Sequence, residues 1–432
     1  MPPRPPEEPI LGSEAAVALW QELAPERWPL PWSALPEGTT LVGGAVRDGL
    51  LGRLGPRPDL DLVVRVEAIA LCRSLAERFG GQAVVLDPER SIARLVIRGW
   101  TVDLARQVGA NLEEDLRRRD FRINALALPL AIEPSLVDPT GGLGDLRRRQ
   151  VVAVAEQNLL DDPLRLLRGL RLASQLDFEL EERTLNWIRL HHARLMEVAP
   201  ERVLGELEKL AASPLGHRGL ALARASGLLE PWASGGQGSG PGSGPGADPD
   251  ALSPERARAC GLNPQESDAA LPLARLAALF DRAALERLRS SRRLQGRCGQ
   301  LRRWRQRLGA SADQAETALG SMGEAERLAL HRQLEVDLPA LVLQLPPELA
   351  QGWMDRWRDP DDTLFHPRPP LDGRDLQRDL GLTASPRLGE LIDHLTLERA
   401  FGRLDNRAEA LEAAKRWLER QTDPATEGPR RD

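Results

Sequence analysis

Residues 41–61 read Leu-Val-Gly-Gly-Ala-Val-Arg-Asp-Gly-Leu-Leu-Gly-Arg-Leu-Gly-Pro-Arg-Pro-Asp-Leu-Asp and run directly into Leu62-Val63-Val64. The pattern predicts a short strand that ends at Val42, a turn at Gly43 and Gly44, and a helix over 45–51. Because glycine lacks a Cβ atom, the backbone can approach an anion closely, and the unpaired N–H groups at a helix start attract negative charge. The stretch therefore predicts a phosphate-binding turn.

Two carboxylates follow this turn, at Asp59 and Asp61. Alternate residues of a strand point to the same face, so both carboxylates share one face while Leu60 and Leu62 occupy the other. Hard oxygen donors of this kind suit the Mg²⁺ that a nucleoside triphosphate carries. A double glycine, or an Asp-x-Asp at a solvated strand end, is common by itself; the order strand, Gly-Gly, helix, Asp-x-Asp strand is far more specific.

This order resembles the nucleotidyltransferase superfamily of DNA polymerase β, and Gly-Gly-Ala-Val-Arg-Asp is similar to the class II CCA-adding enzymes and bacterial poly(A) polymerases. The resemblance implies that Asp59 and Asp61 hold two Mg²⁺ ions as catalytic metal ligands. It also implies that Gly43, Gly44 and Arg47 bind the nucleotide at its triphosphate.

Composition restricts the class of protein. The 432 residues suffice for two to four domains, 41% of them are hydrophobic and 28% charged, and no apolar run approaches the roughly 18 to 20 residues of a membrane span. The first twenty residues lack the pattern of a secretory signal. Three scattered cysteines, Cys72, Cys260 and Cys298, make neither a disulfide framework nor a zinc site. We therefore expect a soluble cytoplasmic protein.

Downstream patterns predict an α+β head, a small mixed sheet with helices. Residues 67–79 have helical spacing, and strands are expected at 84–86, 92–97 and 100–104. Asp103 lies in the last of these strands, either as a surface residue or as a third catalytic carboxylate that deprotonates the attacking hydroxyl or shares a metal. The family resemblance favours the catalytic role, because class II enzymes carry an acidic residue in the equivalent strand.

Residues 111–128 place apolar side chains on one side and Arg119, Asp120 and Asn124 on another, as an amphipathic helix with exposed charges would. The core of this segment, Arg-Arg-Asp-Phe-Arg-Ile-Asn-Ala, is similar to the family pattern Arg-Arg-Asp-Phe-Thr-x-Asn-Ala, with Arg122 in place of the usual Thr. The resemblance implies that Arg119, Asp120 and Asn124 bind the nucleotide. Residues 136–155 then predict a hairpin with a basic turn and no chemistry of its own.

A helix is expected to begin near Asp162, where Asp162, Arg165, Arg168 and Arg171 recur every third residue and form one polar stripe. Such a stripe is usually a solvated face. A carboxylate and a guanidinium can also pair with the exocyclic amine and ring nitrogen of cytosine or adenine, whereas uracil and guanine present the opposite pattern. The resemblance identifies this helix as the protein template of class II CCA-adding enzymes, with all four residues binding the nucleotide.

The domain organisation follows from these segments. We expect a catalytic head over residues 1–155, a helical neck with the nucleotide-selecting helix over 156–232, a flexible Gly/Ser/Pro-rich loop over 233–254, and an all-α body and tail over 255–432 that binds tRNA. Glu201, Arg202, Glu206 and Lys209 are expected to form ion pairs that hold the neck. Arginines concentrated around Trp304 predict either a phosphate-backbone contact or a basic helix paired with acidic neighbours.

The resemblance covers residues 41–230 with specific motifs and 255–420 only loosely. It implies a template-independent tRNA nucleotidyltransferase that adds C, A or both to the tRNA 3′ end from CTP and ATP, with no membrane or protein partner. Only residues 104–117 separate Asp103 from Arg118, which makes a CC-adding enzyme plausible. A-adding and poly(A)-synthesising enzymes are alternatives, and a catalytically silent RNA-binding protein is a remote one.

Overall fold

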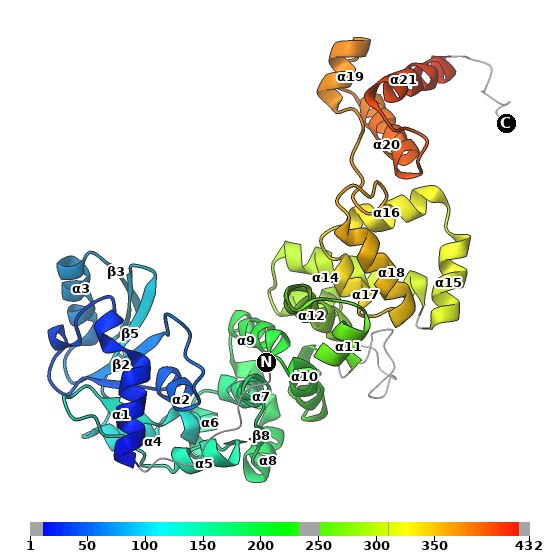
Figure 1. The fold of residues 1–432 in the computed structure, drawn as a ribbon. Helices are drawn as coiled ribbons and strands as arrows, with labels where there is room; N and C mark the ends of the chain where they lie inside the picture. Colours follow the sequence, from blue (N-terminus) through cyan, green and yellow to red (C-terminus); the bar gives the residue numbers. More distant parts are fainter. Residues whose placement is uncertain (1–11, 233–250, 310, 423–432) are drawn as a thin grey trace. The chain divides into compact units, whose positions relative to one another are not determined.

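The computed structural model describes residues 12–232, 251–309 and 311–422 (Figure 1). The chain divides into two compact units, Met1–Ser213 with Leu222–Pro231, and Pro214–Ala221 with Trp232–Asp432. Most of the Gly/Ser/Pro-rich loop predicted over 233–254 lies outside the described residues.

The first unit contains a six-stranded sheet with the strand order β3-β4-β5-β2-β1-β6. The strands are β1 (Thr40–Val42), β2 (Leu60–Val64), β3 (Gln82–Asp87), β4 (Ile92–Ile97), β5 (Trp100–Arg106) and β6 (Ala127–Pro129). β2 and β5 are parallel, whereas the other neighbours are antiparallel. Helix α3 (Ala68–Phe79) packs against β3, β4 and β5 and covers the buried apolar side chains of β4 and β5, whereas Val84, Val85 and Leu86 of β3 are exposed. The predicted α+β head with a mixed sheet is confirmed.

The glycine turn has the predicted form. β1 ends at Val42, Gly43 makes the turn, and helix α2 (Gly44–Leu50) begins directly after it. Helix α1 (Gly12–Leu23) precedes this arrangement and contacts α2. Leu60 and Leu62 are buried in β2, so the alternation predicted for the Asp-x-Asp strand is also present.

The continuous helix expected over 111–128 is wrong. Helix α4 (Leu112–Arg117) ends early, and the chain continues through the 3-10 turn η3 (Arg122–Asn124) into β6. Tertiary hydrogen bonds override the helical pattern here: the Arg122 N–H donates to the carbonyl of Val152, and Phe121 forms a bridge with Ala153. The apolar spacing instead reflects burial in the sheet and turn.

The hairpin expected over 136–155 is also wrong. Asp138 accepts hydrogen bonds from the backbone N–H groups of Gly141, Gly142 and Leu143, and this arrangement starts helix α5 (Gly142–Arg148) where a turn was expected. The following strand β7 (Gln150–Val151) pairs in parallel with β8 (Glu179–Leu180), far downstream. A purely structural role for the Asp-Pro-x-Gly-Gly segment fits these contacts.

Helices complete the first unit. They are α6 (Glu156–Asp161), α7 (Leu164–Leu176), α8 (Glu182–Leu190) and α9 (Pro200–Ala212), with α10 (Gly216–Ala225) following. Helix α7 packs against α9, where Arg171 forms an ion pair with the buried Glu206. Arg202 of α9 pairs with Asp162 at 3.0 Å. The expectation that Arg202 and Glu206 hold the neck through ion pairs is confirmed.

The described part of the second unit is helical. Its helices after α10 are α11 (Pro254–Ala259), α12 (Pro264–Leu279), α13 (Arg282–Arg287), α14 (Arg292–Leu308), α15 (Ala312–Ser321), α16 (Glu324–Leu334), α17 (Leu338–Val342), α18 (Pro347–Arg358), α19 (Gly373–Leu380), α20 (Pro386–Ala400) and α21 (Arg407–Thr422). Trp304 of α14 is buried, while Arg297 pairs with Asp337 and Arg307 pairs with Glu326. At these two arginines, the alternative of a basic helix paired with acidic neighbours is what the structure shows.

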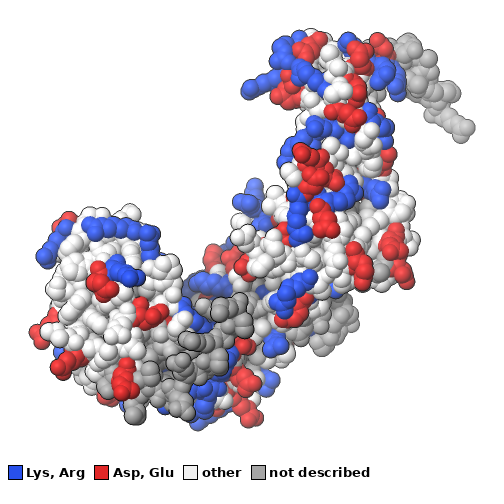
Figure 2. All heavy atoms as spheres, viewed as in Figure 1, with Lys and Arg blue, Asp and Glu red and all other residues white. Residues whose placement is uncertain are grey.

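The surface carries both signs of charge. Figure 2 shows Lys and Arg interspersed with Asp and Glu over the visible face, which agrees with a net charge of −6 spread over many local pairs. Within the described ranges, none of the helices combines the length and the apolar character that a bilayer crossing requires.

Gly142 offers a test of this fold. A Cβ atom at Gly142 would lie 2.2 Å from the carbonyl oxygen of Arg122, a backbone atom that cannot move aside. We expect Gly142→Ala to lower the free energy of unfolding of the first unit by about 1 to 3 kcal/mol through overpacking, measured by thermal or urea denaturation. Gly144→Ala in the same helix is the control, because its Cβ would meet only the flexible end of Arg148. Equal stability of the two variants would contradict the α5 packing.

Candidate active site

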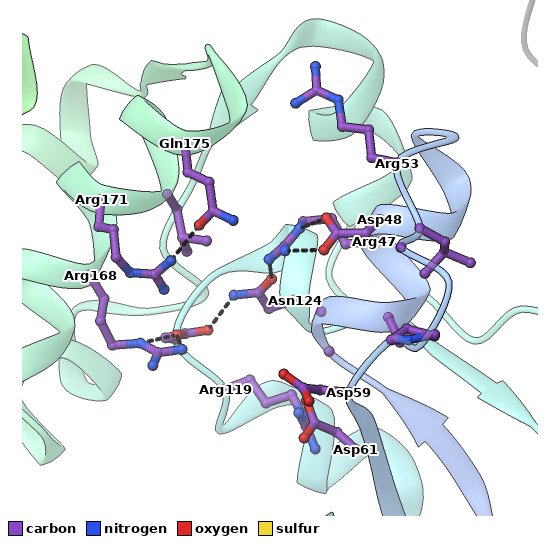
Figure 3. Close-up of a pocket in the computed structure, with 18 of the residues that line it drawn as sticks. Arg47, Asp48, Arg53, Asp59, Asp61, Arg119, Asn124, Arg168, Arg171 and Gln175 are labelled. Carbon is purple, nitrogen blue, oxygen red and sulfur yellow. Dashed lines mark hydrogen bonds and ion pairs between the residues drawn. The ribbon is translucent and has the colours of Figure 1, made fainter. Parts of the chain in front are cut away.

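A cavity of about 540 Å³ lies in the first unit, where the glycine turn, β2, the segment after α4 and helix α7 meet (Figure 3). Most of its lining is polar. The lining residues are Gly43, Gly44, Ala45, Arg47, Asp48, Arg53, Leu54, Gly55, Arg57, Pro58, Asp59, Asp61, Arg119, Asp120, Asn124, Arg168, Arg171, Leu172 and Gln175. The cavity is therefore lined by residues of three predicted motifs. They are the stretch 41–61, the segment with Arg119, Asp120 and Asn124, and the polar stripe of α7.

Gly43 brings the backbone against a carboxylate. Its φ of 73° and ψ of −132° lie in a region that is essentially restricted to glycine. A Cβ atom at this position would also lie 3.2 Å from Oδ2 of Asp61 and 3.5 Å from Nη1 of Arg119. The turn thus leaves space between the chain and the carboxylate that a side chain would fill.

Two of the three predicted carboxylates, Asp61 and Asp103, lie on neighbouring strands. Asp61 of β2 is paired in register with Asp103 of β5, and Asp59 lies exposed just before β2. Asp59 and Asp61 line the cavity, but Asp103 does not. Both carboxylate oxygens of Asp103 instead accept hydrogen bonds from Arg94, each at 2.8 Å.

Asp61 is held in an environment that disfavours its charge. Burial, together with the negative charges of Asp103 and Asp59, raises the pKa of Asp61 to about 6, although the guanidinium groups of Arg119 and Arg94 oppose the shift. A cation placed between Asp59 and Asp61 would remove this penalty. The donor chemistry therefore fits a hard divalent cation.

Asp59 and Asp61 alone would not complete the coordination of a metal ion. Within the described residues, His, Cys, Asp and Glu side chains form no group of three or more that could hold a metal ion. Two carboxylates are nevertheless the usual protein contribution where a substrate phosphate supplies the remaining oxygen ligands. Asp59 and Asp61 are such a pair of carboxylates, to which a nucleotide would add its phosphate oxygens.

A chain of buried polar contacts crosses the floor of the cavity, from α2 through η3 to α7 (Figure 3). Its members are Asp48, Arg47, Asn124, Asp120 and Arg168. Arg47 donates to both oxygens of Asp48 at 2.8 Å and to Oδ1 of Asn124 at 2.6 Å. Asn124 donates to Asp120 at 3.2 Å, and Asp120 accepts from Arg168 at 2.9 to 3.0 Å. Arg47, predicted to meet the triphosphate, thus has all three of its nitrogens directed at the protein.

Asp120 is the charged centre of this chain. Its burial alone would raise its pKa, but the positive charge of Arg168, the N–H of Phe121 and the amide of Asn124 outweigh burial and lower the pKa. Asp120 therefore remains ionised and holds Arg168 in the cavity wall.

Arg119 lines the cavity, and its side chain is 25% exposed. Its Nε is buried without a hydrogen-bond partner, and its Nη2 lies 3.4 Å from Asp115. Because this Nε is closed to solvent, a ligand in the cavity would meet the exposed part of the guanidinium group. The position of Arg119, close to Gly43 and Asp61, suits an anionic ligand.

The polar stripe of α7 is only partly in the cavity. Arg168 and Arg171 reach into it, but Asp162 and Arg165 do not line it. Asp162 accepts from Arg202 and from the N–H of Leu164 at 3.3 Å, and Arg165 donates to the carbonyls of Arg118 and Asn158. Their role in choosing the base stays a prediction.

Four polar or charged lining residues were missed by the sequence reasoning: Asp48, Arg53, Arg57 and Gln175. Arg53 and Arg57 lie in the sequence between the glycine turn and Asp59. Only this position could have identified them as lining residues. Gln175 is one helical turn beyond Arg171 and accepts a hydrogen bond from it, which extends the same stripe.

Comparison with known proteins identifies relatives of this chain. The family model described as the poly A polymerase head domain matches residues 99–152, and the model described as a probable RNA- and SrmB-binding site of polymerase A matches residues 177–234. The chain is 34% identical over 405 residues to a CC-adding tRNA nucleotidyltransferase from Synechocystis sp., covering 90% of this chain and 95% of the relative.

The chain belongs to the class II CCA-adding enzyme and bacterial poly(A) polymerase family. It is therefore a nucleotidyltransferase, and enzymes of this family use divalent metal ions. An A-adding tRNA nucleotidyltransferase from Deinococcus radiodurans is 42% identical over 209 residues, which cover 47% of this chain and 46% of that relative.

Solved structures of this family share the fold. A CCA-adding enzyme with CTP has a TM-score of 0.66 at 21% identity and covers 94% of this chain and 98% of its own. The Thermotoga maritima CCA-adding enzyme in complex with tRNA has a TM-score of 0.61 at 21% identity and covers 88% and 91%. These likenesses confirm the head with its mixed sheet and the helical remainder.

The pKa of Asp61 gives a stability prediction. A carboxylate whose pKa rises from 3.8 to about 6 on folding destabilises the fold above pH 6, and this cost disappears as the pH falls to 4. In EDTA, we expect Asp61→Asn to increase the free energy of unfolding at pH 8 by about 2 to 3 kcal/mol, with little gain near pH 4. Glu113→Gln, at an exposed position of α4, is the control. A gain that does not change with pH would show that the charge of Asp61 is not its source.

Proposed function

We propose that this chain extends the 3′ end of tRNA with nucleotides taken from CTP or ATP, without a nucleic-acid template. The observation that carries the proposal is the cavity in which Asp59 and Asp61 face the glycine turn and the guanidinium groups of Arg119 and Arg168. Carboxylates for a divalent cation and arginines for phosphate are the parts that phosphoryl transfer needs. Relatives named as CC-adding and A-adding tRNA nucleotidyltransferases support the substrate.

Each motif has a part in the proposed reaction. Asp59 and Asp61 would hold Mg²⁺, which when bound neutralises charge on the phosphates. The guanidinium group of Arg119 would donate to the nucleotide, with Gly43 and Gly44 leaving room for its phosphates. Arg47 would act indirectly, because its bonds to Asp48 and Asn124 fix the wall that the nucleotide contacts.

Asp103 would assist at the attacking 3′ hydroxyl. It lies in register with Asp61, but Arg94 engages both of its oxygens. To accept a proton, Asp103 would share one oxygen between Arg94 and the hydroxyl. Asp162 and Arg165 would select cytosine or adenine over uracil or guanine, as their hydrogen-bonding groups allow.

Addition of C is the product that the observations favour. The relative that matches nearly the whole chain is named as a CC-adding enzyme, and the connection between Asp103 and Arg118 is short. Addition of A is a second candidate, because the A-adding relative is 42% identical over 209 residues.

The domain roles follow the same proposal. The head, residues 1–155, would carry the chemistry, and the neck, residues 156–232, would carry the nucleotide-selecting helix. The helical body and tail, residues 255–432, would hold the tRNA by its shape and phosphates. We propose the cytoplasm as the compartment where the chain meets tRNA.

The catalytic assignment is tested with Asp59→Ala and Asp61→Ala. A cation contributes several kcal/mol to charge stabilisation, so each variant should lose on the order of a thousandfold in labelled CTP incorporation into tRNA. Glu113→Ala, which removes an exposed carboxylate of α4, should keep full activity. Undiminished activity in either aspartate variant would remove the proposed metal-holding role of that residue.

The product is tested by the acceptor. Three tRNAs that end at the discriminator base, at C or at CC are each offered CTP or ATP, and the products are resolved by length. For a CC-adding enzyme we expect two C additions to the first, one to the second, and none of either nucleotide to the third. Addition of A to the tRNA that ends in CC would replace CC-adding by CCA- or A-adding activity, and repeated A addition would indicate poly(A) synthesis.

A further inference from the structure

The two faces of the sheet are covered unequally. Helix α3 covers one face of β3, β4 and β5, where Leu95 and Leu104 are fully buried. On the other face, the apolar cluster that includes Val42, Val63 and Leu116 covers β1 and β2. Beyond β2 this second face continues across β5, β4 and β3 with side chains that are partly or largely exposed.

A row of residues crosses this uncovered face from the carboxylates to the sheet edge. Asp61 pairs with Asp103, Asp103 pairs with Arg94, and Arg94 pairs with Val84 of the edge strand β3. Side chains paired across a sheet lie on the same face. One continuous surface therefore connects the proposed catalytic carboxylates to Val84.

The far end of this row has an unusual composition. Val84 and Val96 are each 40% exposed, and the Arg94 side chain is 43% exposed between them. Arg94 uses Nε and Nη2 for Asp103, which leaves Nη1 outside that pair. Aliphatic groups beside a guanidinium can contact the face of a base or ribose and a phosphate at the same time.

The reaction needs a second substrate on this side. In phosphoryl transfer, the attacking and leaving oxygens lie roughly in line, so the acceptor approaches the carboxylates opposite the leaving pyrophosphate. The cavity proposed for the nucleotide includes Asp59 and Asp61 but no residue of β3, β4 or β5. The uncovered face beside Asp103 is the surface left for the acceptor.

We propose that the surface formed by Val84, Arg94 and Val96, here called the acceptor face, receives the 3′-terminal nucleotides of the acceptor RNA. Val84 and Val96 contact the terminal base and ribose, and Arg94 contacts the adjoining phosphate. The acceptor face rests on the proposed function, because it assigns a place to the second substrate of that reaction.

The chain provides a matched pair of positions for the test. Val84 and Val85 are adjacent in β3 and are 40% and 41% exposed. Val84 pairs with Arg94 on the acceptor face, whereas Val85 pairs with Ala93, whose side chain is buried on the α3 side. Asp at either position places the same charge in the same strand, on opposite faces.

The test measures the KM for an RNA minihelix that ends at the discriminator base, and separately the KM for CTP. We expect Val84→Asp and Val96→Asp to raise the KM for RNA by about tenfold or more through repulsion of the phosphates, with the KM for CTP unchanged. Val85→Asp should leave both values unchanged. An unchanged KM for RNA in Val84→Asp, or an equal rise in Val85→Asp, would overturn the acceptor face.

Two further measurements separate the alternatives. If the edge strand binds a second copy of the chain, Val84→Asp will change the mass in solution while the KM for RNA stays constant, which overturns the proposal. Photocrosslinking of RNA with a photoreactive 3′-terminal nucleotide requires no turnover. Crosslinks within residues 82–96 support the acceptor face. They do so even if the wild-type chain incorporates neither CTP nor ATP, because that lack of activity would refute only the proposed function. Crosslinks confined to other segments overturn the acceptor face.

Discussion

The geometry of the active site depends on the buried polar chain that runs from Asp48 through Arg47, Asn124 and Asp120 to Arg168. Each member satisfies its neighbour, and several are almost completely buried. Loss of one member would leave the next as an unpaired buried polar group, which costs several times more than an average hydrogen bond contributes. Because the chain ties α2, η3 and α7 together, it fixes the glycine turn relative to the arginines of the neck helix.

A second constraint is the electrostatic balance around Asp61. Burial and two neighbouring carboxylates raise its pKa, and Arg94 and Arg119 offset only part of that effect. If the arginines neutralised the acidic cluster completely, the cluster would have no preference for a cation. If they neutralised none of its charge, the fold would be destabilised whenever no cation is bound. The arginines therefore keep the acidic cluster foldable and still attractive to a divalent ion. In the proposed reaction, Asp61 would thus give up stability for cation binding, as catalytic groups often do.

Local chemistry explains which parts of the molecule could be predicted from sequence. The glycine turn and the Asp-x-Asp strand follow from short-range rules, and their spacing places them in one site. The segments 111–128 and 136–155 were misjudged because their conformations depend on distant partners: the carbonyl of Val152 holds Arg122, and β7 pairs with β8. The α7 stripe shows a related limit. Periodicity identifies which face of a helix is polar, but it does not tell where along that face the cavity ends, and the cavity reaches Arg168 but not Arg165.

The position of Asp162 and Arg165 outside the cavity is compatible with base selection. Asp162 would release Arg202, and because this pair is partly exposed its loss costs at most about 1 kcal/mol. Arg165 would release the carbonyls of Arg118 and Asn158, at about 1 kcal/mol each. A nucleotide that binds with micromolar affinity gains about 8 kcal/mol, enough to offset this rearrangement. Because Arg118 precedes Arg119, release of its carbonyl by Arg165 would link the choice of base to the segment that we propose to contact the phosphates.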